Sequence, residues 1–335
     1  MHALVDTTAI HILEELAAET DWLASQLGRP LSLVAESDLN DPRLITPRER
    51  NGYGLTAQWA DDIHHAIHTA VSGERQGYYA DFGSLATLAE TLRHGYFHAG
   101  TYSSFRRRRH GRPLDTTEGT GIPATRLVAY TCTHDQVGNR ALGDRPSQNL
   151  TPGQCAVKAA LALGSPYTAM LFMGEEYGAS TPFQFFSSHP EPELARATAE
   201  GRKAEFADHG WNAAKNGAIP DPQDPQTFQR SKLNWDEVGV GDHARLHGVY
   251  RDLIALRHAD PDLADPWLDH LTVDYDEDEG WISLARGRLR IACNLGTAPA
   301  KVPVAGEVIL SWGEPTVEGG STVLDGHSFA IVRVQ

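Results

Sequence analysis

The sequence of 335 residues contains few cysteines and no long apolar run. Its three cysteines, Cys132, Cys155 and Cys293, are far apart, and no CxxC spacing occurs. An odd number of scattered cysteines is typical of free thiols in a reducing compartment. No stretch approaches the roughly 18 apolar residues of a membrane span, and residues 1–20 lack the basic start and apolar core of a signal peptide. We therefore expect a cytoplasmic protein without a membrane partner.

Positive charge is also scarce, because 29 basic residues face 44 acidic ones and the formal net charge is −15. This excess of acidic residues argues against nucleic acid or an anionic membrane as the main partner. We expect the basic run at 106–109 to be a loop whose arginines form salt bridges with acidic neighbours. Hydrophobic residues make up 41% of the chain, which is typical of a globular protein. The length allows one large domain and a small one.

Helical and apolar stretches alternate over the first 265 residues. Amphipathic spacing and good terminal residues predict helices at 6–27, 85–92, 152–163 and 243–258. Short apolar runs predict strands at 31–35, 127–131 and 168–173, with a less clear one at 96–100. Strands that are apolar on both faces and alternate with helices indicate a parallel sheet covered by helices.

The pattern changes after a boundary near 258–267. Short strands separated by glycine, proline and aspartate turns are expected at 281–285, 289–295, 302–304, 308–312 and 329–334. Arg286-Gly287 is a candidate hairpin turn. The sequence therefore predicts an α/β domain at 1–265 and a small antiparallel β domain at 266–335.

Acidic residues follow the predicted parallel strands, with Glu36, Asp135 and Glu175 each near a strand's carboxyl end. In parallel α/β barrels that end carries the active site. Glu36 is the sharpest candidate, because a partly desolvated carboxyl at a strand end would suit a general acid. A helix cap or a loop salt bridge explains Glu36 equally well. Glu175 and Glu176 are ambiguous, and we favour a structural role for them.

The tripeptide His134-Asp135-Gln136 ends another buried run. Its carboxylate could stabilise positive charge, and all three side chains could hold sugar hydroxyls. An Asx-type turn is the structural alternative. Two such acidic strand ends, together with aromatic residues such as Trp59 and Phe185, indicate glycoside chemistry, which uses a pair of carboxylates. Core packing accounts for most of the aromatic residues equally well.

Three histidines, at 64, 65 and 68, form a cluster in which His64 and His68 share a helix face. This spacing occurs in zinc helices. The glutamate of an HExxH motif is absent, however, and Asp61 and Asp62 lie on the same turn. We therefore expect a sugar-contacting or packed segment here, and no metal.

Several motifs, in a fixed order, resemble the alpha-amylase superfamily of glycoside hydrolases. They are ESDLNDP (36–42), QWADDIHH (58–65), HDQVGNR (134–140) and MGEEYG (173–178). Within the superfamily, the sequence is similar to the enzymes that release trehalose. This resemblance implies the second half of a (β/α)8 TIM barrel followed by a small antiparallel β domain. It also implies a maltooligosyl trehalose or α-1,4-glucan substrate and no cofactor.

The resemblance also implies roles for individual residues. Glu36 matches the general acid/base, and Asp135 matches the carboxylate that stabilises the transition state. His134 would contact the sugar at the cleavage point, and His2 matches a histidine three residues beyond the nucleophile. Thr133 departs from the usual Asn. The remaining expected substrate contacts are Asp38, Asn40, Trp59, Asp61 and Gln136.

The nucleophilic aspartate of the superfamily would fall two residues before Met1. We therefore expect a truncated copy that lacks the first four barrel strands and is inactive alone; a genuine short protein is the alternative. Two other activities remain open. The chain could derive from a glycogen-branching enzyme, or it could bind α-glucan without catalysis.

Overall fold

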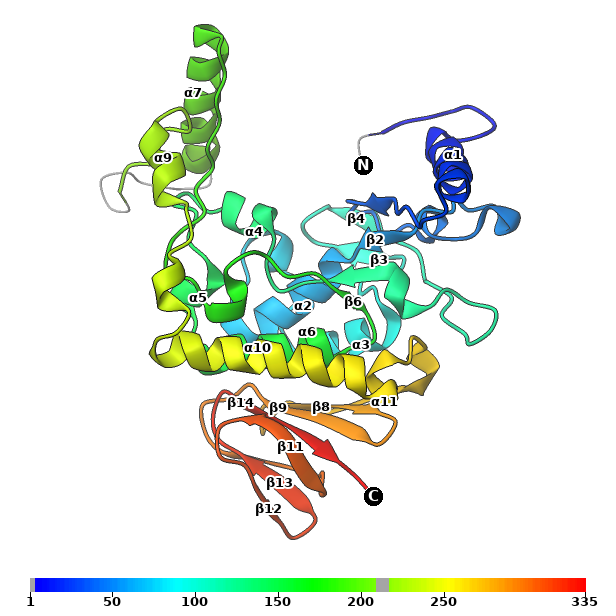
Figure 1. The fold of residues 1–335 in the computed structure, drawn as a ribbon, viewed down its shortest axis with the longest axis vertical. Helices are drawn as coiled ribbons and strands as arrows, with labels where there is room; N and C mark the ends of the chain where they lie inside the picture. The colour runs from blue at the N-terminus through cyan, green and yellow to red at the C-terminus, as the bar shows by residue number, and fades with distance from the viewer. Residues whose placement is uncertain (1–3, 209–216) are drawn as a thin grey trace. The chain divides into compact units, whose positions relative to one another are not determined.

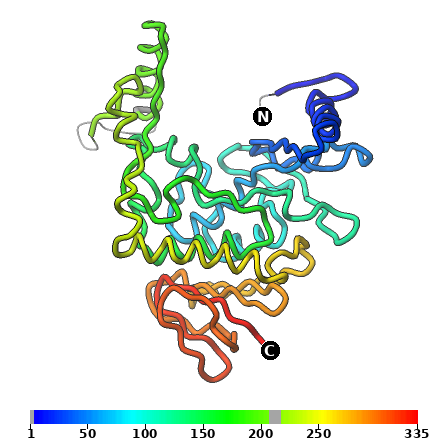
Figure 2. Tube along the Cα trace, viewed as in Figure 1, coloured from blue at the N-terminus to red at the C-terminus, as the bar shows by residue number. Residues whose placement is uncertain are grey.

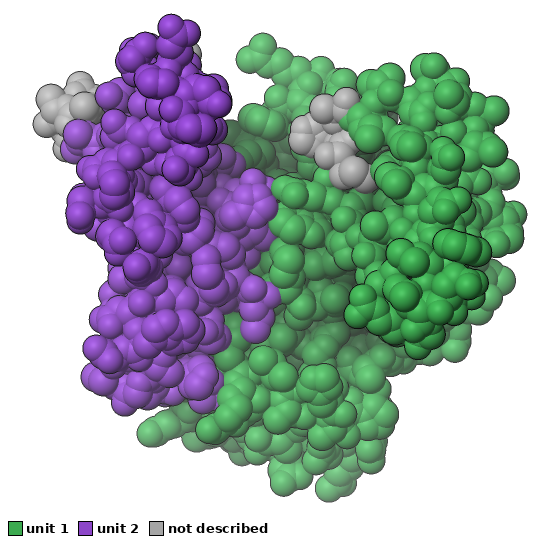
Figure 3. Space-filling view, turned by 45° about the horizontal axis from the view of Figure 1, so that its top comes forward, with its two compact units in different colours: residues 1–131, 156–170, 249–335 green, residues 132–155, 171–248 purple. Residues whose placement is uncertain are grey.

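A computed structural model describes residues 4–208 and 217–335, so His2 lies outside the described residues. The chain divides into two compact units (Figure 3). Unit 1 comprises residues 1–131, 156–170 and 249–335, and unit 2 comprises residues 132–155 and 171–248. Within the described residues, no helix combines the length and apolar character needed to span a bilayer.

Unit 1 contains a parallel sheet of four short strands in the order β1–β2–β5–β6. Two of these strands, β2 and β6, are labelled in Figure 1. The strands are β1 (Val34–Ala35), β2 (Ala57–Trp59), β5 (Leu127–Ala129) and β6 (Thr168–Ala169). Each neighbouring pair is parallel, and each is joined by two residue pairs. Helices α2 (Asp61–Ser72) and α3 (Leu85–His94) follow β2 along the chain. The expected alternation of parallel strands and helices is therefore present.

The strand limits differ from the prediction in two ways. In each of the apolar runs at 31–35 and 168–173, only two residues pair with a neighbouring strand. They are the residues of β1 and β6, and the rest of each run lies outside the sheet. The fourth strand is β2, whereas 96–100 is not a strand. The amides of Phe97 and His98 donate instead to the carboxylate of Asp62, 2.9 and 2.8 Å away. The prediction of a strand at 96–100 is therefore wrong.

Helix α1 (Ile12–Leu27) begins later than the expected residue 6. The Asp6 carboxylate accepts the amide protons of Ile12 and Thr8, which holds residues 6–11 outside the helix. These hydrogen bonds lower the pKa of Asp6 to about 2, the bonds to Thr8 contributing first. The helix ends as expected at Gly28, whose φ of +62° suits glycine.

The remaining helices are mostly short. Helix α6 (Pro152–Gly164) begins as expected, because Thr151 Oγ1 accepts the Gln154 amide at 3.2 Å. Helix α10 (Gly241–Ala259) also matches its predicted range. Helix α7 (Pro192–Asp208) was not expected. The other α-helices of the described chain are α4 (His134–Gly138), α5 (Pro146–Asn149), α9 (Pro225–Arg230) and α11 (Pro261–Ala264).

The C-terminal strands form two antiparallel sheets, drawn in orange and red in Figure 2. One has the order β11–β14–β9–β8–β7 and the other β10–β13–β12. The strands are β7 (Leu271–Asp276), β8 (Trp281–Arg286), β9 (Leu289–Asn294), β10 (Ala300–Val302), β11 (Glu307–Trp312), β12 (Thr316–Glu318), β13 (Ser321–Leu324) and β14 (Ser328–Arg333). Gly287, with a φ of +50°, turns β8 into β9 at the expected hairpin. Strands β7, β12 and β13 were missed by the sequence prediction.

Two arginines, of which Arg286 is buried and Arg257 is partly buried, donate to backbone carbonyls around the end of α6. Arg286, at the end of β8, donates to the carbonyls of Gly164, Leu263 and Asp265. Burial, reinforced by the neighbouring Arg257, lowers the pKa of Arg286 to about 10. Arg257 itself donates to three carbonyls in the segment that leads to β6. The backbone carbonyls at the end of α6 and in the neighbouring loops thus accept hydrogen bonds from arginine side chains.

Candidate active site

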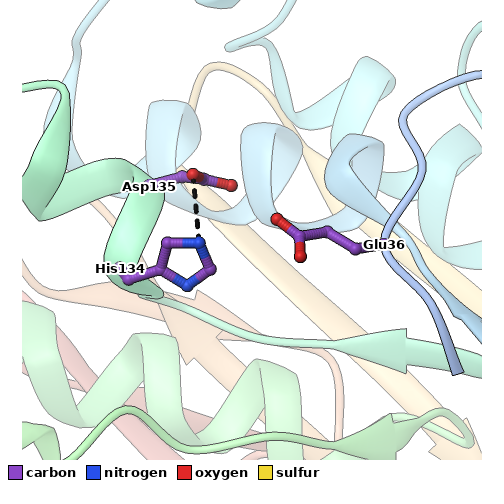
Figure 4. A group of neighbouring side chains, drawn as sticks. All are labelled: Glu36, His134 and Asp135. Carbon is purple, nitrogen blue, oxygen red and sulfur yellow. Dashed lines mark ion pairs between the residues drawn. The ribbon is translucent and has the colours of Figure 1, made fainter. Parts of the chain in front are cut away.

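Glu36 comes directly after β1, at the carboxyl end of the parallel sheet (Figure 4). The preceding Ala35 is 1% exposed and pairs with Gln58 of β2, which fixes the backbone there. Ser37, next along the chain, is also buried. The Glu36 side chain is exposed in the described part of the chain, so the expectation that its carboxyl is partly desolvated is wrong. The structure therefore gives Glu36 a rigid backbone position and an accessible carboxylate.

His134 and Asp135 begin α4, five and six residues after the last residue of β5. Thr133 caps this helix, because its Oγ1 accepts the Asp135 amide proton at 3.1 Å. Gln136 completes the cap, its Oε1 accepting from the Thr133 amide at 2.6 Å. This capping box replaces the Asx-type turn that the sequence suggested. Thr133 thus supports the loop through this cap, although it departs from the Asn usual at this position.

The side chains of His134 and Asp135 lie next to each other in unit 2. His134 Nε2 is 3.4 Å from Asp135 Oδ1, the ion pair drawn in Figure 4. Their side chains are 54% and 49% exposed, so both can reach a ligand. Gln136 is buried at 8% and its carbonyl oxygen is used by the cap. A substrate contact from Gln136 stays a prediction that this cap does not support.

Asp38 and Asn40, in the loop after Glu36, make internal contacts. The Asp38 carboxylate pairs with Arg106 at 2.6 Å, which confirms a salt bridge from the basic run. The expectation that the whole run is a loop is wrong, because Arg108 and Arg109 lie in strand β4 (Arg108–His110), which pairs with β3 (Thr101–Ser103). The carbonyl of Asp38 accepts from His110 Nε2 at 2.8 Å. Asn40 is 1% exposed, and its amide donates to Asp62 Oδ2 at 2.8 Å and to the His98 carbonyl at 3.1 Å. The structure gives both residues a part in holding this loop.

Trp59 and Asp61 lie at the carboxyl end of β2. Trp59 packs against Val128 and meets the Tyr130 ring edge-on at 5.5 Å. The Tyr130 hydroxyl donates to Asp61 Oδ1. Both residues therefore contact the end of β5, and their substrate roles stay predictions.

The histidines of α2 are buried and bond to protein side chains. His64 Nε2 lies 3.0 Å from the Tyr79 hydroxyl. His68 lies between Glu74 and the buried Lys158, 3.1 Å from each, and Lys158 also donates to the Thr131 carbonyl. His65 stacks on Tyr78, and burial lowers its pKa to about 3. The packed segment expected from the sequence is present in unit 1.

Glu175 and Glu176 have the structural role favoured from the sequence. Glu175 Oε2 accepts the Phe172 amide at 3.1 Å, and Glu176 Oε2 accepts the Gly174 amide at 2.8 Å. Gly174 has a φ of +88° in this turn. The two carboxylates thus close the loop that follows β6.

A cavity of about 430 Å³ lies between α4 and α7 within unit 2, and we call it the α4–α7 pocket. Its lining residues are His134, Asp135, Gly138, Asn139, Phe185, Ala197, Thr198, Gly201, Arg202 and Glu205. Sequence reasoning found His134, Asp135 and the aromatic Phe185 but missed every residue from α7. The Ala- and Glu-rich composition of 192–208 is a helix signal that could have revealed it.

Solved structures with the same fold include alpha-amylases. The putative alpha-amylase of Salmonella typhimurium matches with a TM-score of 0.83 and 34% identity, over 100% of this chain and 56% of that one. The alpha-amylase of H. orenii matches with a TM-score of 0.55 and 14% identity, over 96% of this chain and 56% of that one. The fold is therefore that of the alpha-amylases, and the predicted fold class, part of a TIM barrel followed by a β domain, is confirmed.

The curated relatives that match this chain share one name within the alpha-amylase class. A malto-oligosyltrehalose trehalohydrolase of Mycobacterium tuberculosis is 74% identical over 333 residues, which are 99% of this chain and 56% of the relative. One from Arthrobacter ramosus is 54% identical over 100% of this chain and 56% of the relative. One from Saccharolobus solfataricus is 40% identical over 77% of this chain and 41% of the relative.

The chain is similar to the malto-oligosyltrehalose trehalohydrolases over 99% or more of its length in the Mycobacterium tuberculosis and Arthrobacter ramosus comparisons, and it spans about half the length of these curated relatives. The resemblance read from its motifs is confirmed. A family model described as a domain of unknown function, DUF3459, matches residues 266–331 in the region of the antiparallel sheets.

Proposed function

We propose that this chain carries the acid/base half of a glycosidase that acts on maltooligosyl trehalose. The reaction is hydrolysis of the α-1,4 bond next to the terminal trehalose, with release of trehalose. The observation that carries the proposal is the 74% identity, over 99% of the chain, to a relative named malto-oligosyltrehalose trehalohydrolase. The accessible carboxylates of Glu36, directly after β1, and of Asp135, in the first turn of α4, support it, because glycosidases act through carboxylates that flank the scissile bond.

Glu36 is the proposed general acid/base. It would protonate the leaving oxygen and then activate the water that completes hydrolysis. The short strand β1 fixes its backbone while its side chain stays accessible to substrate. A rigid position with a reachable carboxylate is what proton transfer at a sugar oxygen needs.

Asp135 is the proposed stabiliser of the positive charge that develops on the reacting sugar. Its backbone is held by the Thr133 cap, and its carboxylate lies beside His134. An ionised carboxylate aimed at a developing oxocarbenium ion lowers the barrier electrostatically. His134 would bond a hydroxyl of the same sugar ring.

A chimeric enzyme tests this proposal. These 335 residues replace the matched part of the Mycobacterium tuberculosis relative, whose remaining sequence is kept, and trehalose release from maltooligosyl trehalose is measured. We expect trehalose as a product, and Glu36→Gln in the chimera should lower kcat about 10²–10⁴-fold. Sugar binding should be largely unchanged, because the amide keeps the shape of the carboxylate.

Glu49→Gln is the matched control, since Glu49 is also an exposed glutamate of unit 1 but lies in a short 3-10 turn. It should leave kcat unchanged. Formation of branched glucan without free trehalose would assign the chain to a branching enzyme instead. Sugar binding without any turnover in the chimera would favour a non-catalytic glucan-binding role.

A further inference from the structure

Both ends of helix α3 bond to the DUF3459 region, residues 266–331. At the start of the helix, Glu277, from the turn between β7 and β8, accepts two backbone amide protons. Its Oε1 lies 3.0 Å from the Leu85 nitrogen, and its Oε2 lies 3.2 Å from the Ala86 nitrogen. The first amides of a helix have no partner within the helix, and a carboxylate also suits the positive end of the helix dipole. Glu277 therefore completes the start of α3 from a distant part of the sequence.

The cap at this end is shared between two segments of the chain. Ser84 is the N-cap residue, and its Oγ accepts the Thr87 amide proton at 3.0 Å. The two amides before Thr87 bond to Glu277, which lies 192 positions after Leu85. Ser84 and Glu277 together thus satisfy the first three amides of the helix. The DUF3459 region completes a cap that the local sequence only begins.

The opposite end of α3 is fixed to the same region. Arg93, in the last turn, donates to the carbonyl of Val273 on β7, and α3 packs along β7. Tyr167, which is fully buried, donates to the Leu92 carbonyl at 2.6 Å. Isolated helices shorter than about 12–15 residues are marginally stable in water, and α3 has ten residues. Its position therefore depends on contacts such as these at its ends.

Helix α3 leads directly into the segment that Asp62 anchors. The His98 amide, four residues after the helix ends, donates to Asp62 Oδ2 at 2.8 Å. The same oxygen accepts from Asn40 Nδ2 at 2.8 Å, and Asn40 Nδ2 also donates to the His98 carbonyl at 3.1 Å. Asn40 lies in the loop that follows Glu36, four residues further along the chain. Hydrogen bonds and short chain segments therefore connect Glu277 to the loop of the proposed general acid/base.

We propose that the DUF3459 region positions the Glu36 carboxylate, and that Glu277 is the residue through which it does so. Glu277 caps α3, α3 holds the 97–98 segment, and this segment shares Asp62 with the loop that follows Glu36. The inference rests on the proposed function, because it takes Glu36 as the general acid/base. Glu277 acts through α3 and is therefore a positioning residue. A small displacement of a catalytic group slows the chemical step and leaves substrate binding intact.

Hydrogen exchange of the 335-residue chain, followed at single amides, tests the structural part of this inference. In Glu277→Ala, the amides of residues 85–86 should exchange about fivefold faster, because they lose their acceptor. The amides of residues 97–98 and of Arg112, which donates to the Asn40 carbonyl at 3.0 Å, should exchange about twofold faster. Glu277→Gln should recover part of this protection, since its amide oxygen accepts one proton. The ladder amides of β9 and β14 should be unchanged.

The chimeric enzyme tests the catalytic part. Glu277→Ala should lower kcat about twofold to fivefold and leave KM unchanged, because the groups that bind the sugar stay in place and only the acid/base moves. Glu277→Gln should recover part of the lost kcat. A residue that only stabilised the fold would leave kcat unchanged at temperatures where the enzyme is folded.

Two variants in the same region serve as controls. Glu279→Ala removes another exposed carboxylate from the turn that carries Glu277, and it should change neither hydrogen exchange nor kcat. Asn294→Ala removes a fully buried amide that donates to the carbonyls of Ala298 and Asp325. It should lower the urea midpoint of unfolding at least as much as Glu277→Ala does, yet leave kcat and the exchange of residues 97–98 unchanged. The two controls separate loss of position from loss of charge and from loss of stability.

Three results would overturn the inference. They are faster exchange confined to residues 85–86, an unchanged kcat in Glu277→Ala, and an equal loss of kcat in Asn294→Ala. The two readouts also separate this inference from the proposed function. A wild-type chimera that releases no trehalose defeats the proposed function, while the exchange of residues 97–98 in the 335-residue chain still shows whether the DUF3459 region holds the loop after Glu36.

Discussion

The two kinds of sheet in unit 1 are held together in different ways. Each neighbouring pair in the parallel sheet shares two residue pairs, whereas β7–β8, β8–β9 and β9–β14 share six each. Strands β8, β9 and β14 thus obtain their order from backbone ladders and from side chains that are buried on both faces of the sheet. The parallel strands are only two or three residues long. Hydrogen bonds from side chains fix the position of the loops that follow them. Glu36 lies in one of these side-chain-held segments.

Asp62 shows how such a segment is held. It is 5% exposed and accepts hydrogen bonds from Asn40 Nδ2 and from the amides of Phe97 and His98. One carboxylate on α2 therefore replaces a strand ladder for two loops, including the one that follows Glu36. Side-chain anchors permit irregular, accessible loops, and functional groups concentrate on loops positioned by a rigid scaffold. The longer ladders provide stability and little accessible chemistry.

Removing an aromatic side chain from the antiparallel sheet should have the largest effect. Phe329 of β14 is 0% exposed, and its strand lies between β9 and β11. Phe329→Ala should lower the free energy of unfolding by about 4 kcal/mol, through lost burial and the cavity that remains. Urea titration measures the loss. Hydrogen exchange should locate it in β9, β11 and β14, and equal loss of protection in α2 would contradict a separate ladder-held region.

Removing the anchor of the parallel region should cost slightly less. Asp62→Ala leaves three donors without this acceptor, two of them buried and one partly buried, and should lower the free energy of unfolding by about 3 kcal/mol. Hydrogen exchange should rise at 96–99 and leave β8 and β9 protected. Asp278→Ala, which removes an exposed carboxylate of the β domain, is the control and should change stability by no more than about 0.5 kcal/mol. Uniform loss of protection across both sheets would show that Asp62 is not a local anchor.

The same contrast decides how much the sequence could predict. Apolar runs, caps and turn glycines located the helices α3, α6 and α10 and most of the ladder strands, because these signals are local. Glu36 was also readable, since an apolar run followed at once by a carboxylate is a local pattern, and Asp135 is the first carboxylate after the apolar run of β5. Thr133 and Gln136 form a capping box that the Thr-x-x-Gln spacing could have revealed.

The missed features depend on residues far apart in the sequence. Asn40 and Asp62 are separated by 22 positions, and no local rule predicts that one accepts the amide of the other. Strand β2 is only three residues long. It overlaps the motif QWADDIHH, in which the sequence analysis sought substrate contacts and did not expect a strand. Strand β12 is exposed throughout and therefore lacks the alternation that marks a strand.

Acid should weaken the parallel region through His65. Burial, then Arg106, His68 and His98, lowers the pKa of His65 from 6.5 to about 3. The unfolded chain takes up a proton near pH 6.5 and the folded chain does so only near pH 3, so stability is lost as the pH falls between these values. The loss should be about 2 kcal/mol at pH 5 relative to pH 7. Burial also lowers the pKa of His64, which adds to the effect in the same direction.

His65→Phe isolates this contribution, because the ring can still stack on Tyr78. Urea unfolding at pH 7 and pH 5 should show a pH-dependent loss smaller by about 2 kcal/mol than in the wild-type chain. His94→Phe, which replaces an imidazole that is 59% exposed, is the control. An identical pH dependence in the wild-type chain and His65→Phe would show that His65 does not govern the acid response.

The smallest effect on stability concerns the open edge of the parallel sheet. Strand β1 is an edge strand among the described residues, and Val34 on it is 48% exposed. Exposed apolar edges pair with other chains. We expect the 335-residue chain to self-associate, as size-exclusion chromatography with light scattering would show. Val34→Lys should shift it toward monomer while changing the free energy of unfolding by less than about 0.5 kcal/mol.

Val317 supplies the matched control from an antiparallel sheet. It is 44% exposed on the edge strand β12, but Glu314 and Glu318 lie nearby in the sequence and discourage pairing through their charge. Val317→Lys should therefore leave the association state unchanged. A wild-type chain that is monomeric at every concentration would refute the exposed-edge argument. Equal dissociation by both lysine variants would mean that added charge, and not the β1 edge, controls association.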